Sequence, residues 1–395
     1  MEINSYIDRE SPFQPGKRVD SYYFKGRQES IIKILRYVNS VKNSQVQHFF
    51  LTGQKGIGKT SLAEFVRQYI EDNLGLTGVY VSNKDNSTVE GLINLIFEAL
   101  LYKIPKNILT DKVKSIFGHI DSLEFKGAKI NFKPTGDESH DLKDNFHFYL
   151  NKILKNINED NGVFLVIDDI NGLSESLDFV NWYKRFADTI EMDTNINLKL
   201  YVLIIGYPEK FNNLVLKEQS FGRIFHYEEI GLLNDNEVKE FFKDTLDSVN
   251  IKCGDNIIDK FTYFASGLPL LMQQIGDSAF WLENDNEIKE NQIRDIVINA
   301  ADEIGNKQIR PALDLISNSN FESILLKLGK FDKLKFRRED LENILNDDEI
   351  LILDDFLYTM VNSGIFNTKG LNDEIYEFSN GLYPAYFKIK SYDFI

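Results

Sequence analysis

The residues of this chain with the clearest chemical potential form one glycine-rich run, Gly53-Gln54-Lys55-Gly56-Ile57-Gly58-Lys59-Thr60. The run matches the pattern Gly-x4-Gly-Lys-Ser/Thr in full. Its glycines allow the backbone to curl so that N–H groups point at phosphate oxygens, and a helix beginning near Lys59 adds its positive dipole end. Lys59 is expected to reach the β- and γ-phosphates, the Thr60 hydroxyl to ligate magnesium, and Ser61 to complete the site. The run therefore predicts a phosphate-binding loop (P-loop) for ATP/ADP with Mg²⁺.

A second candidate is the run Val163-Phe164-Leu165-Val166-Ile167-Asp168-Asp169, an apolar stretch that ends in two carboxylates. The magnesium of a P-loop is held at the carboxyl edge of a parallel sheet, so Asp168 is expected to bind it directly or through water. Asp169 is expected to orient or activate the attacking water. The alternative is a polar helix cap after a core strand. Asp is one methylene shorter than Glu, which predicts slow hydrolysis.

The elements that must position these residues alternate between strands and helices. Short apolar runs predict buried strands, and apolar residues at three- and four-residue spacing predict helices. The expected strands are 46–51, 78–81, 163–167 and 198–205, and the expected helices follow Phe24 and span 62–70, 89–101, 141–157 and 176–190. This alternation predicts an α/β fold with a parallel sheet flanked by helices on both faces.

Beyond Gly231 the pattern becomes helical. Helices are expected at 235–248, 257–265, 268–283 and 288–304, which predicts a separate helical domain. From about Gln308, helices followed by two short alternating runs around Lys369-Gly370 predict a winged-helix domain. Residues 115–133 alternate around Lys126-Gly127 and predict a β-hairpin insertion.

Composition excludes several kinds of function. Acidic residues outnumber basic ones 61 to 45, and the formal charge of −16 disfavours a bare nucleic-acid backbone or an anionic membrane. Cys253 is the only cysteine, so an intrachain disulfide and a Cys-based zinc site are excluded. The histidines show no ligand-like pairing, and no signal peptide or membrane-spanning stretch is recognisable. We therefore expect a cytoplasmic protein with no membrane partner.

The P-loop region resembles the branch of AAA+ ATPases that joins origin-recognition initiators to STAND signalling ATPases. Four segments carry the resemblance: Phe24-Lys25-Gly26-Arg27-Gln28-Glu29, the lead-in Ser11-Pro12-Phe13-Gln14-Pro15-Gly16, Ile205-Gly206-Tyr207-Pro208-Glu209, and Ser266-Gly267-Leu268-Pro269-Leu270. The resemblance spans about residues 11–305. It implies that Arg27 lies near the adenine and that Pro269 lies against the nucleotide.

The sequence departs from this family at two places. Initiator-type relatives carry an arginine beside the Gly-x-Pro motif, where this chain has Leu268 and Leu270. The fourth strand ends in Ile205-Gly206 without the usual polar first sensor. Arg223 lies where relatives often place an arginine finger, and the alternative is an ordinary surface arginine. The missing sensors favour a slow, nucleotide-dependent switch.

The expected C-terminal domain tests whether DNA is a partner. Acidic residues outnumber basic ones from Lys307 to Ile395, and the expected recognition helix, 349–363, contains no lysine or arginine. A helix in the major groove needs donors and positive charge. The dense basic cluster Lys333-Leu334-Lys335-Phe336-Arg337-Arg338 precedes that helix. A protein contact or self-docking is therefore favoured over DNA reading.

The resulting domain organisation has four parts: an extended lead-in (1–23), an AAA+/STAND core (24–233) with an insertion near 104–140, a helical lid (234–305) and a winged-helix domain (306–395). The favoured hypothesis is an ATPase with slow hydrolysis that acts as a nucleotide-dependent switch. The switch would control self-association, as a homo-oligomer, or binding of a protein partner. The alternatives are a DNA-associated AAA+ ATPase resembling replication initiators or transposition regulators, and a nucleotide-bound adaptor without turnover.

Overall fold

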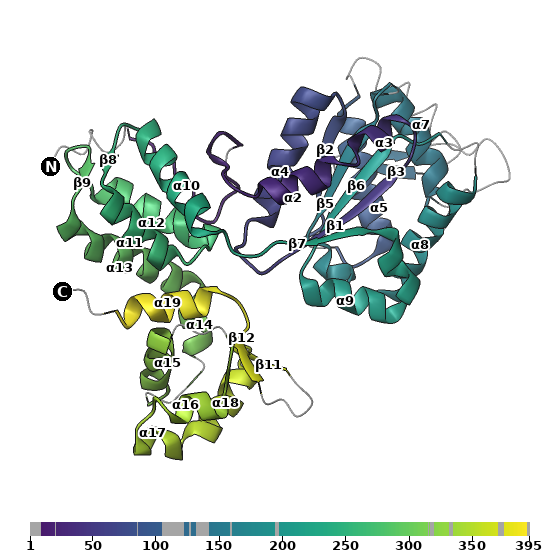
Figure 1. Ribbon diagram of the computed structural model, residues 1–395. Coiled ribbons are helices and arrows are strands. Elements are labelled where there is room, and N and C mark those ends of the chain that lie inside the picture. Colours follow the sequence, from purple (N-terminus) through teal and green to yellow (C-terminus); the bar gives the residue numbers. More distant parts are fainter. Residues whose placement is uncertain are drawn as a thin grey trace. The chain divides into compact units, whose positions relative to one another are not determined.

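The structure is a computed structural model of the 395-residue chain, and it describes residues 9–19, 21–84, 86–104, 122–125, 128–131, 142–158, 160–193, 197–314, 316, 320–331, 335–369 and 375–392. The chain divides into two compact units (Figure 1). Unit 1 comprises residues 1–26, 54–58 and 231–395, and unit 2 comprises residues 27–53 and 59–230. No helix in the described residues is both long and apolar enough to cross a bilayer.

Unit 2 is built on a five-stranded sheet with the order β2-β5-β6-β1-β7, in which every pairing is parallel. The strands are β1 (Gln47–Thr52), β2 (Thr77–Ser82), β5 (Val163–Asp168), β6 (Leu200–Ile205) and β7 (His226–Glu229). Each of the expected strands is present. The parallel α/β fold predicted from the alternation of apolar runs is therefore confirmed.

Both faces of this sheet are buried, since β5 and β6 are buried at every position and β5 is apolar from Val163 to Ile167. Val163, Leu165 and Ile167 of β5 belong to one hydrophobic cluster, whereas Phe164 points to the opposite face. There the Phe164 ring meets the Tyr201 ring of β6 edge-on, with 5.1 Å between centroids. A strand buried on both faces is expected in a parallel sheet that helices cover on both sides.

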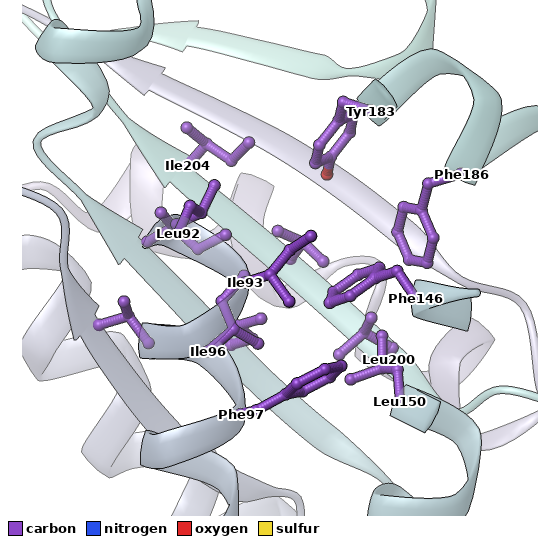
Figure 2. Packing of buried hydrophobic residues seen from close by; sticks show 14 of the residues in the cluster. Leu92, Ile93, Ile96, Phe97, Phe146, Leu150, Tyr183, Phe186, Leu200 and Ile204 are labelled. Carbon is purple, nitrogen blue, oxygen red and sulfur yellow. The ribbon is translucent and has the colours of Figure 1, made fainter. Parts of the chain in front are cut away.

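The helices of unit 2 divide between the two faces. Figure 2 shows the first face, where side chains of α5, α7 and α8 pack around Leu200 and Ile204 of β6. On the second face, α3 and α4 contact β6, and α2 contacts α4. The helices are α2 (Gln28–Leu35), α3 (Val38–Lys42), α4 (Lys59–Tyr69), α5 (Val89–Tyr102), α7 (Phe146–Ile157), α8 (Leu177–Met192) and α9 (Pro208–Lys217).

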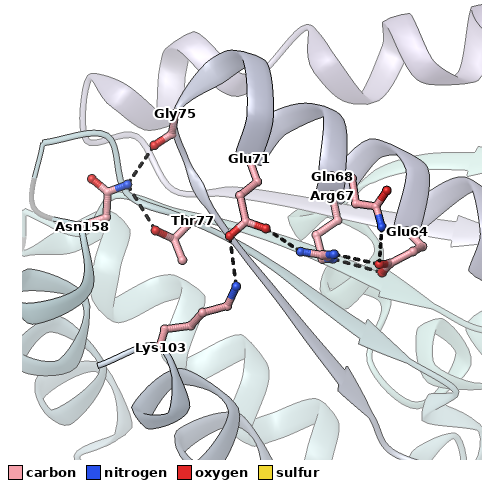
Figure 3. A network of polar contacts seen from close by, with 8 residues as sticks. All are labelled: Glu64, Arg67, Gln68, Glu71, Gly75, Thr77, Lys103 and Asn158. Atoms are coloured by element: carbon pink, nitrogen blue, oxygen red, sulfur yellow. Dashed lines mark hydrogen bonds and ion pairs between the residues drawn. The ribbon is translucent and has the colours of Figure 1, made fainter. Parts of the chain in front are cut away.

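A polar network fixes α4, the helix that begins at Lys59, beside β2 (Figure 3). The Arg67 guanidinium donates to both oxygens of Glu64, at 3.0 and 2.7 Å, and to Glu71 at 2.7 Å. Lys103, just after α5, also donates to Glu71. Gly78 of β2 leaves room for this arginine, since a Cβ there would lie 2.7 Å from its Cγ. The P-loop helix is therefore held by charge pairs as well as by core packing.

The expected hairpin insertion is present as β3 (Ser122–Phe125) and β4 (Ala128–Asn131), which pair antiparallel. The rest of the expected range 115–133, including the expected turn at Lys126-Gly127, lies outside the described residues.

Unit 1 begins after β7 with a group of helices: α10 (Asp235–Ser248), α11 (Asp255–Ala265), α12 (Pro269–Leu282) and α13 (Ile293–Ile304). The bounds of α10 match the expected ones because a capping box defines its start, with Asn234 and Glu237 bonded to each other's backbone N–H. Two short parallel strands, β8 (Lys252–Cys253) and β9 (Glu287–Ile288), join the loops of this group.

The C-terminal part of unit 1 contains further helices and a three-stranded antiparallel sheet, in the order β10-β12-β11. The strands are β10 (Lys335–Arg337), β11 (Phe366–Lys369) and β12 (Ile375–Phe378). The helices are α14 (Arg310–Leu313), α15 (Asn320–Phe331), α16 (Arg338–Glu342), α17 (Asp347–Leu351), α18 (Leu353–Asn362) and α19 (Leu382–Lys390). This composition agrees with the winged-helix prediction, which otherwise stays a prediction.

One expectation for this region is wrong in detail. The single helix expected at 349–363 is divided into α17 and α18, because Ile352 leaves helical geometry with φ −103° and ψ 4°. Within the basic cluster that precedes it, Lys335–Arg337 forms β10 and pairs with β12. The exposed face of α18 carries Asp354, Asp355 and Tyr358, so its acidic character is retained.

The lead-in packs onto the helices of unit 1. Phe13 is 3% exposed and lies edge-on to Phe241 of α10. The Gln14 N–H donates to the side-chain oxygen of Gln273 on α12 at 2.7 Å. A Cβ on Gly276 of α12 would lie 2.2 Å from the Phe13 ring, so the ring needs a glycine at that position. The predicted domain boundaries stay a prediction, but the lead-in, lid and C-terminal segments fall within one compact unit.

Candidate functional site

The strand order of unit 2 brings the two candidate motifs to one edge of the sheet. β1 leads into the P-loop and β5 ends at Asp168. β6 lies between these two strands. The residues that follow β6, Gly206 and Tyr207, therefore stand between the P-loop and the two carboxylates.

The P-loop backbone has the conformation that its glycines were expected to permit. Gly56 and Gly58 have φ values of 78° and 91°, a region that side-chain-bearing residues rarely adopt. The helix α4 begins at Lys59, so its N-terminal N–H groups face the loop. Gly53 and Ile57 are buried, whereas Gln54 and Lys55 are exposed.

Thr60 and Asp168 meet directly, as the magnesium assignment requires. The Thr60 hydroxyl donates to Asp168 Oδ2 at 2.7 Å, and the Tyr80 hydroxyl of β2 donates to the same oxygen. Asp168 is 8% exposed. A hydroxyl and a carboxylate at hydrogen-bond distance are the oxygen donors that Mg²⁺ prefers, and the rest of its shell is usually water and phosphate. The residues present therefore fit that ion.

The described side chains do not by themselves form a complete metal site. Within the described residues, no group of three or more His, Cys, Asp or Glu side chains could hold a metal ion. Any divalent cation here thus depends on ligands that a bound phosphate would supply.

Lys59 is held inside the loop by a hydrogen bond and by a ring contact. Its ammonium donates to the Gly53 carbonyl at 2.7 Å and lies 4.5 Å from the centre of the Tyr207 ring. Burial lowers the pKa of Lys59 to about 8, although nearby Asp168, Glu209 and Asp169 oppose that shift. A group with this pKa binds phosphate most strongly when it is protonated, below about pH 8.

Asp169 differs from Asp168 in both backbone and surroundings. It has φ 61° and ψ 60°, a left-handed conformation, and it is only partly buried. Its carboxylate accepts a hydrogen bond from the Asn171 amide. Asp169 therefore turns away from the extended strand direction that Asp168 follows, and Asn171 fixes its orientation.

The middle of the P-loop contacts other residues of unit 1. A Cβ on Gly56 would lie 3.3 Å from the Leu270 Cβ, and one on Gly58 would lie 3.6 Å from the Pro269 Cγ. Pro269 is the first residue of α12. The Gly381 N–H, at the start of α19, donates to Gln54 Oε1 at 3.0 Å. Pro269 thus lies beside Gly58 of the phosphate loop, and its expected position against the nucleotide stays a prediction.

The remaining expected residues lie at the periphery of unit 2. Arg27 begins α2 in a left-handed conformation with φ 65°, and Ser61 lies in the first turn of α4, partly buried. Arg223 is exposed at the end of the 3-10 turn Gln219–Ile224. Neither the adenine role of Arg27 nor the arginine-finger role of Arg223 is tested by these positions, and both stay predictions.

Three residues of the site were not recognised from the sequence: Tyr80, Asn171 and Tyr207. Tyr80 lies on β2, which is far in sequence from either motif. It reaches Asp168 only because β2 pairs with β5 in the register Ser82↔Asp168. Tyr207 belongs to the segment Ile205-Gly206-Tyr207-Pro208-Glu209, which was noted only for its resemblance. The signal that could have identified it is its position directly after a strand that neighbours β1.

Comparisons with known proteins agree with this geometry. Residues 23–182 match the family model described as AAA ATPase domain. No curated protein sequence matches the chain. A Walker-type ATPase of Pyrococcus abyssi has a similar structure, with a TM-score of 0.55 at 15% identity over 96% of this chain and 99% of that one. The ORC2 protein of Aeropyrum pernix has a TM-score of 0.53 at 12% identity over 97% and 96%.

These findings define the class of protein. Residues 23–182 are similar to the AAA ATPase domain family, and the P-loop lies within that range. Its fold is shared along nearly the whole length by the archaeal Walker-type ATPase and by the ORC2 protein. The resemblance to the origin-recognition branch is thereby confirmed at the level of the fold.

Proposed function

We propose that this chain binds ATP at the P-loop and hydrolyses it slowly to ADP and phosphate. The observation that carries the proposal is the contact of Thr60 with Asp168, which links the P-loop to the acidic strand end. The similar ORC2 structure contains ADPNP and ADP, which supports adenine nucleotides as the ligands here. The half-buried Lys59 supplies the positive charge that a triphosphate requires.

Each residue has a distinct role in this proposal. Thr60 and Asp168 would hold Mg²⁺, which neutralises phosphate charge when it is bound. Asp169 orients the attacking water and accepts its proton, so that the water oxygen bonds to the γ-phosphorus while the bond to ADP breaks. Asn171 holds the Asp169 carboxylate by a hydrogen bond. The short reach of Asp favours slow turnover.

We further propose that the bound nucleotide acts as a switch on self-association or on binding of a protein partner. The support comes from unit 1, where Gln54, Gly56 and Gly58 of the P-loop contact α19, Leu270 and Pro269 respectively. A change of phosphate ligand at the loop therefore acts directly on residues of α12 and α19. The exposed acidic residues of α18 favour a protein partner over DNA.

The test is the mass of the full chain in ADP and in a non-hydrolysable ATP analogue, measured by size-exclusion chromatography with light scattering. We expect the measured mass, or the fraction of the chain bound to a partner, to differ between the ADP and ATP-analogue states. Lys59→Ala should abolish the difference by preventing binding, whereas Asp169→Asn should bind ATP and remain in the ATP form. The alternatives give other results.

An adaptor without turnover would tolerate Asp169→Asn completely but not Lys59→Ala. A DNA-associated ATPase would bind duplex DNA with a steep dependence on salt. An equal mass in both nucleotides, with no partner effect, contradicts the switch, and absence of nucleotide binding to the wild type contradicts the proposal as a whole.

A further inference from the structure

The exposed side of α17 and α18 carries two large apolar side chains among carboxylates (Figure 1). Leu351 is 83% exposed and Tyr358 is 72% exposed. Single apolar side chains on a surface are ordinary, but these two have the i, i+7 spacing that brings residues to one side of a helix. The other exposed residues of this side are acidic, namely Asp347, Asp348, Asp354 and Asp355. We refer to these six residues as the acidic–apolar stripe.

The burial pattern shows that the stripe is continuous in spite of the break at Ile352. Its exposed positions recur at three- or four-residue spacing from Asp347 to Tyr358. The positions that alternate with them are buried, namely Glu349, Leu353, Phe356, Leu357 and Met360. Both helices therefore turn the same side outwards, and that side mixes carboxylates with apolar surface.

The buried side of the two helices holds the stripe in a fixed place. Glu349 of α17 accepts hydrogen bonds from Ser323 and Lys327 of α15, at 2.6 and 2.5 Å. The Phe356 ring of α18 lies edge-on to Phe321 of α15, with 5.4 Å between centroids. A surface that is already ordered loses little conformational entropy when a partner binds to it, which favours affinity.

The charge of the stripe determines what kind of partner fits it. α17 and α18 contain no lysine or arginine. Arg338 of α16 donates to Asp354 at 2.9 Å and offsets the charge of that carboxylate. Nucleic acid is repelled by such a surface, whereas a segment rich in lysine and arginine is attracted. A second copy of this chain is disfavoured, because each copy carries a formal charge of −16.

We propose that the acidic–apolar stripe is the docking surface for a basic amphipathic helix of a different protein. The lysines or arginines of that helix pair with the carboxylates, and its aliphatic side chains pack on Leu351 and Tyr358. The stripe is roughly 16 Å long, which corresponds to about three turns of a bound helix. The inference rests on the proposed binding of a protein partner, and it names the surface and the chemistry of that partner.

The probe is a fluorescein-labelled peptide of about 14 residues, with leucines at helical spacing and lysines between them. Its binding to the full chain is measured by fluorescence anisotropy as a function of salt. One control peptide has serine in place of leucine, and the other has glutamate in place of lysine. We expect the peptide that is both basic and aliphatic to bind most tightly, and the acidic one not to bind.

The apolar part of the stripe is tested by Leu351→Ala combined with Tyr358→Ala. This double variant should lower the affinity for the leucine–lysine peptide by about tenfold or more, because both anchors are lost. The matched control is Leu216→Ala combined with Tyr102→Ala, which removes side chains that are 81% and 65% exposed elsewhere. Its affinity should equal that of the wild type, and thermal unfolding confirms that each variant is folded.

The acidic part is tested by Asp348→Asn combined with Asp355→Asn. The affinity should fall by about three- to tenfold at low salt, and its dependence on salt should become weaker. The control, Asp72→Asn combined with Glu191→Gln, neutralises two other exposed carboxylates and should leave the affinity unchanged.

Absence of binding of the leucine–lysine peptide to the wild type overturns the inference. Equal affinities in the stripe variants and their controls also overturn it, because binding would then follow the overall charge of the chain. A light-scattering mass that exceeds one chain in the wild type and falls to one chain when Leu351 and Tyr358 are replaced would identify a second copy as the occupant instead. Duplex DNA that binds the wild type but not the stripe variants would likewise replace the proposed partner.

The same experiment separates this inference from the nucleotide switch. Binding of the leucine–lysine peptide to the stripe is measured without nucleotide, with ADP and with a non-hydrolysable ATP analogue. Equal affinities in the three states contradict the switch alone, and the docking surface stands. A mass that differs between nucleotides, without peptide binding, contradicts the docking surface alone.

Discussion

Asp168 and Asp169 are adjacent in sequence, yet the structure places them in different chemical settings. Asp168 is buried at the end of β5, where Thr60 and Tyr80 both donate to its Oδ2. Asp169 has a left-handed backbone and a partly exposed side chain bonded to Asn171. The two hydroxyl donors hold the Asp168 carboxylate beside Thr60, the other residue assigned to the cation. The more exposed carboxylate has the access that contact with water requires.

At the residue scale, the pKa of Lys59 predicts how the affinity for nucleotide depends on pH. Its pKa in the free protein is about 8, and phosphate charges in a complex raise it. The affinity for nucleotide should therefore have its full value below pH 8. It should fall as pH rises through that value, by up to about tenfold per pH unit. The measurement is titration with a non-hydrolysable ATP analogue between about pH 7 and about pH 9.5.

Lys59→Gln provides the control, because glutamine keeps a polar side chain that does not titrate. Its affinity should be weak and nearly independent of pH over the same range. A wild-type affinity that stays constant across pH 8 would contradict the assignment of Lys59 as the charged phosphate ligand.

The motif residues could be predicted from sequence because their chemistry is local in the chain. Gly53 to Thr60 need only a strand before and a helix after them, and Asp168 needs only the end of an apolar run. Tyr80 and Tyr207 could not be predicted in this way. Tyr80 reaches Asp168 because of the register of β2 on β5, and Tyr207 reaches Lys59 because β6 is placed beside β1. Pairing order and register are properties of the whole sheet.

At the element scale, β1 carries a buried histidine that couples its packing to pH. His48 Nδ1 lies 2.8 Å from the Tyr183 hydroxyl of α8, among the rings of Phe186 and Phe225. Burial, and to a lesser extent the nearby His226, lower the pKa of His48 to about 4. The native state therefore keeps His48 neutral where an unfolded chain would protonate it.

This shift predicts a loss of stability in acid. The contribution of His48 to the free energy of unfolding is fully present above the unfolded pKa of about 6.5 and is lost as pH falls towards 4. The loss amounts to about 2 kcal/mol at pH 5. Urea unfolding at about pH 7.5 and pH 5 measures the loss. His48→Gln keeps an acceptor for Tyr183 but cannot titrate, so its loss should be smaller. Equal losses in the two proteins would exclude His48 as the cause.

The element bounds show which helix and strand ends local sequence signals can predict and which they cannot. The bounds of α10 were predicted correctly because the capping residues Asn234 and Glu237 are present in the sequence. The break between α17 and α18 at Ile352 was missed, since no glycine or proline marks it. β10 was also missed, because Lys335 to Arg337 reads as a basic cluster until its partner strand β12 is known.

The contact of Phe13 with α12 gives a second prediction at this scale. Gly276→Ala improves helix propensity by about 1 kcal/mol but places a Cβ where the Phe13 ring lies. Displacing a buried phenylalanine costs about 2 to 3 kcal/mol, so the net change should be destabilising. Thermal unfolding of Gly276→Ala, Phe13→Ala and the double variant measures the coupling. The double variant should be no less stable than Phe13→Ala, whereas additive losses would show that the two sites are independent.

At the scale of the whole molecule, the middle of the P-loop packs within unit 1. Residues 54–58 fall in unit 1, whereas Gly53, Lys59 and Thr60 fall in unit 2. Such a division could not be predicted from a motif, because the motif describes one continuous loop. It depends on contacts that Gln54, Gly56 and Gly58 make with residues more than two hundred positions later in the chain.

The hydrogen bond from Gly381 to Gln54 predicts how a signal from the loop reaches the C-terminal part of unit 1. The Gly381 N–H at the start of α19 has the Gln54 side chain as its acceptor, and Gln54 is exposed. Gln54→Ala removes that acceptor with little change in core packing. Hydrogen exchange of α19 in the ADP and ATP-analogue states should therefore differ in the wild type and become similar in Gln54→Ala. Lys55→Ala, at the adjacent exposed position, should keep the wild-type difference, and a difference that persists in Gln54→Ala would rule out this contact as the link.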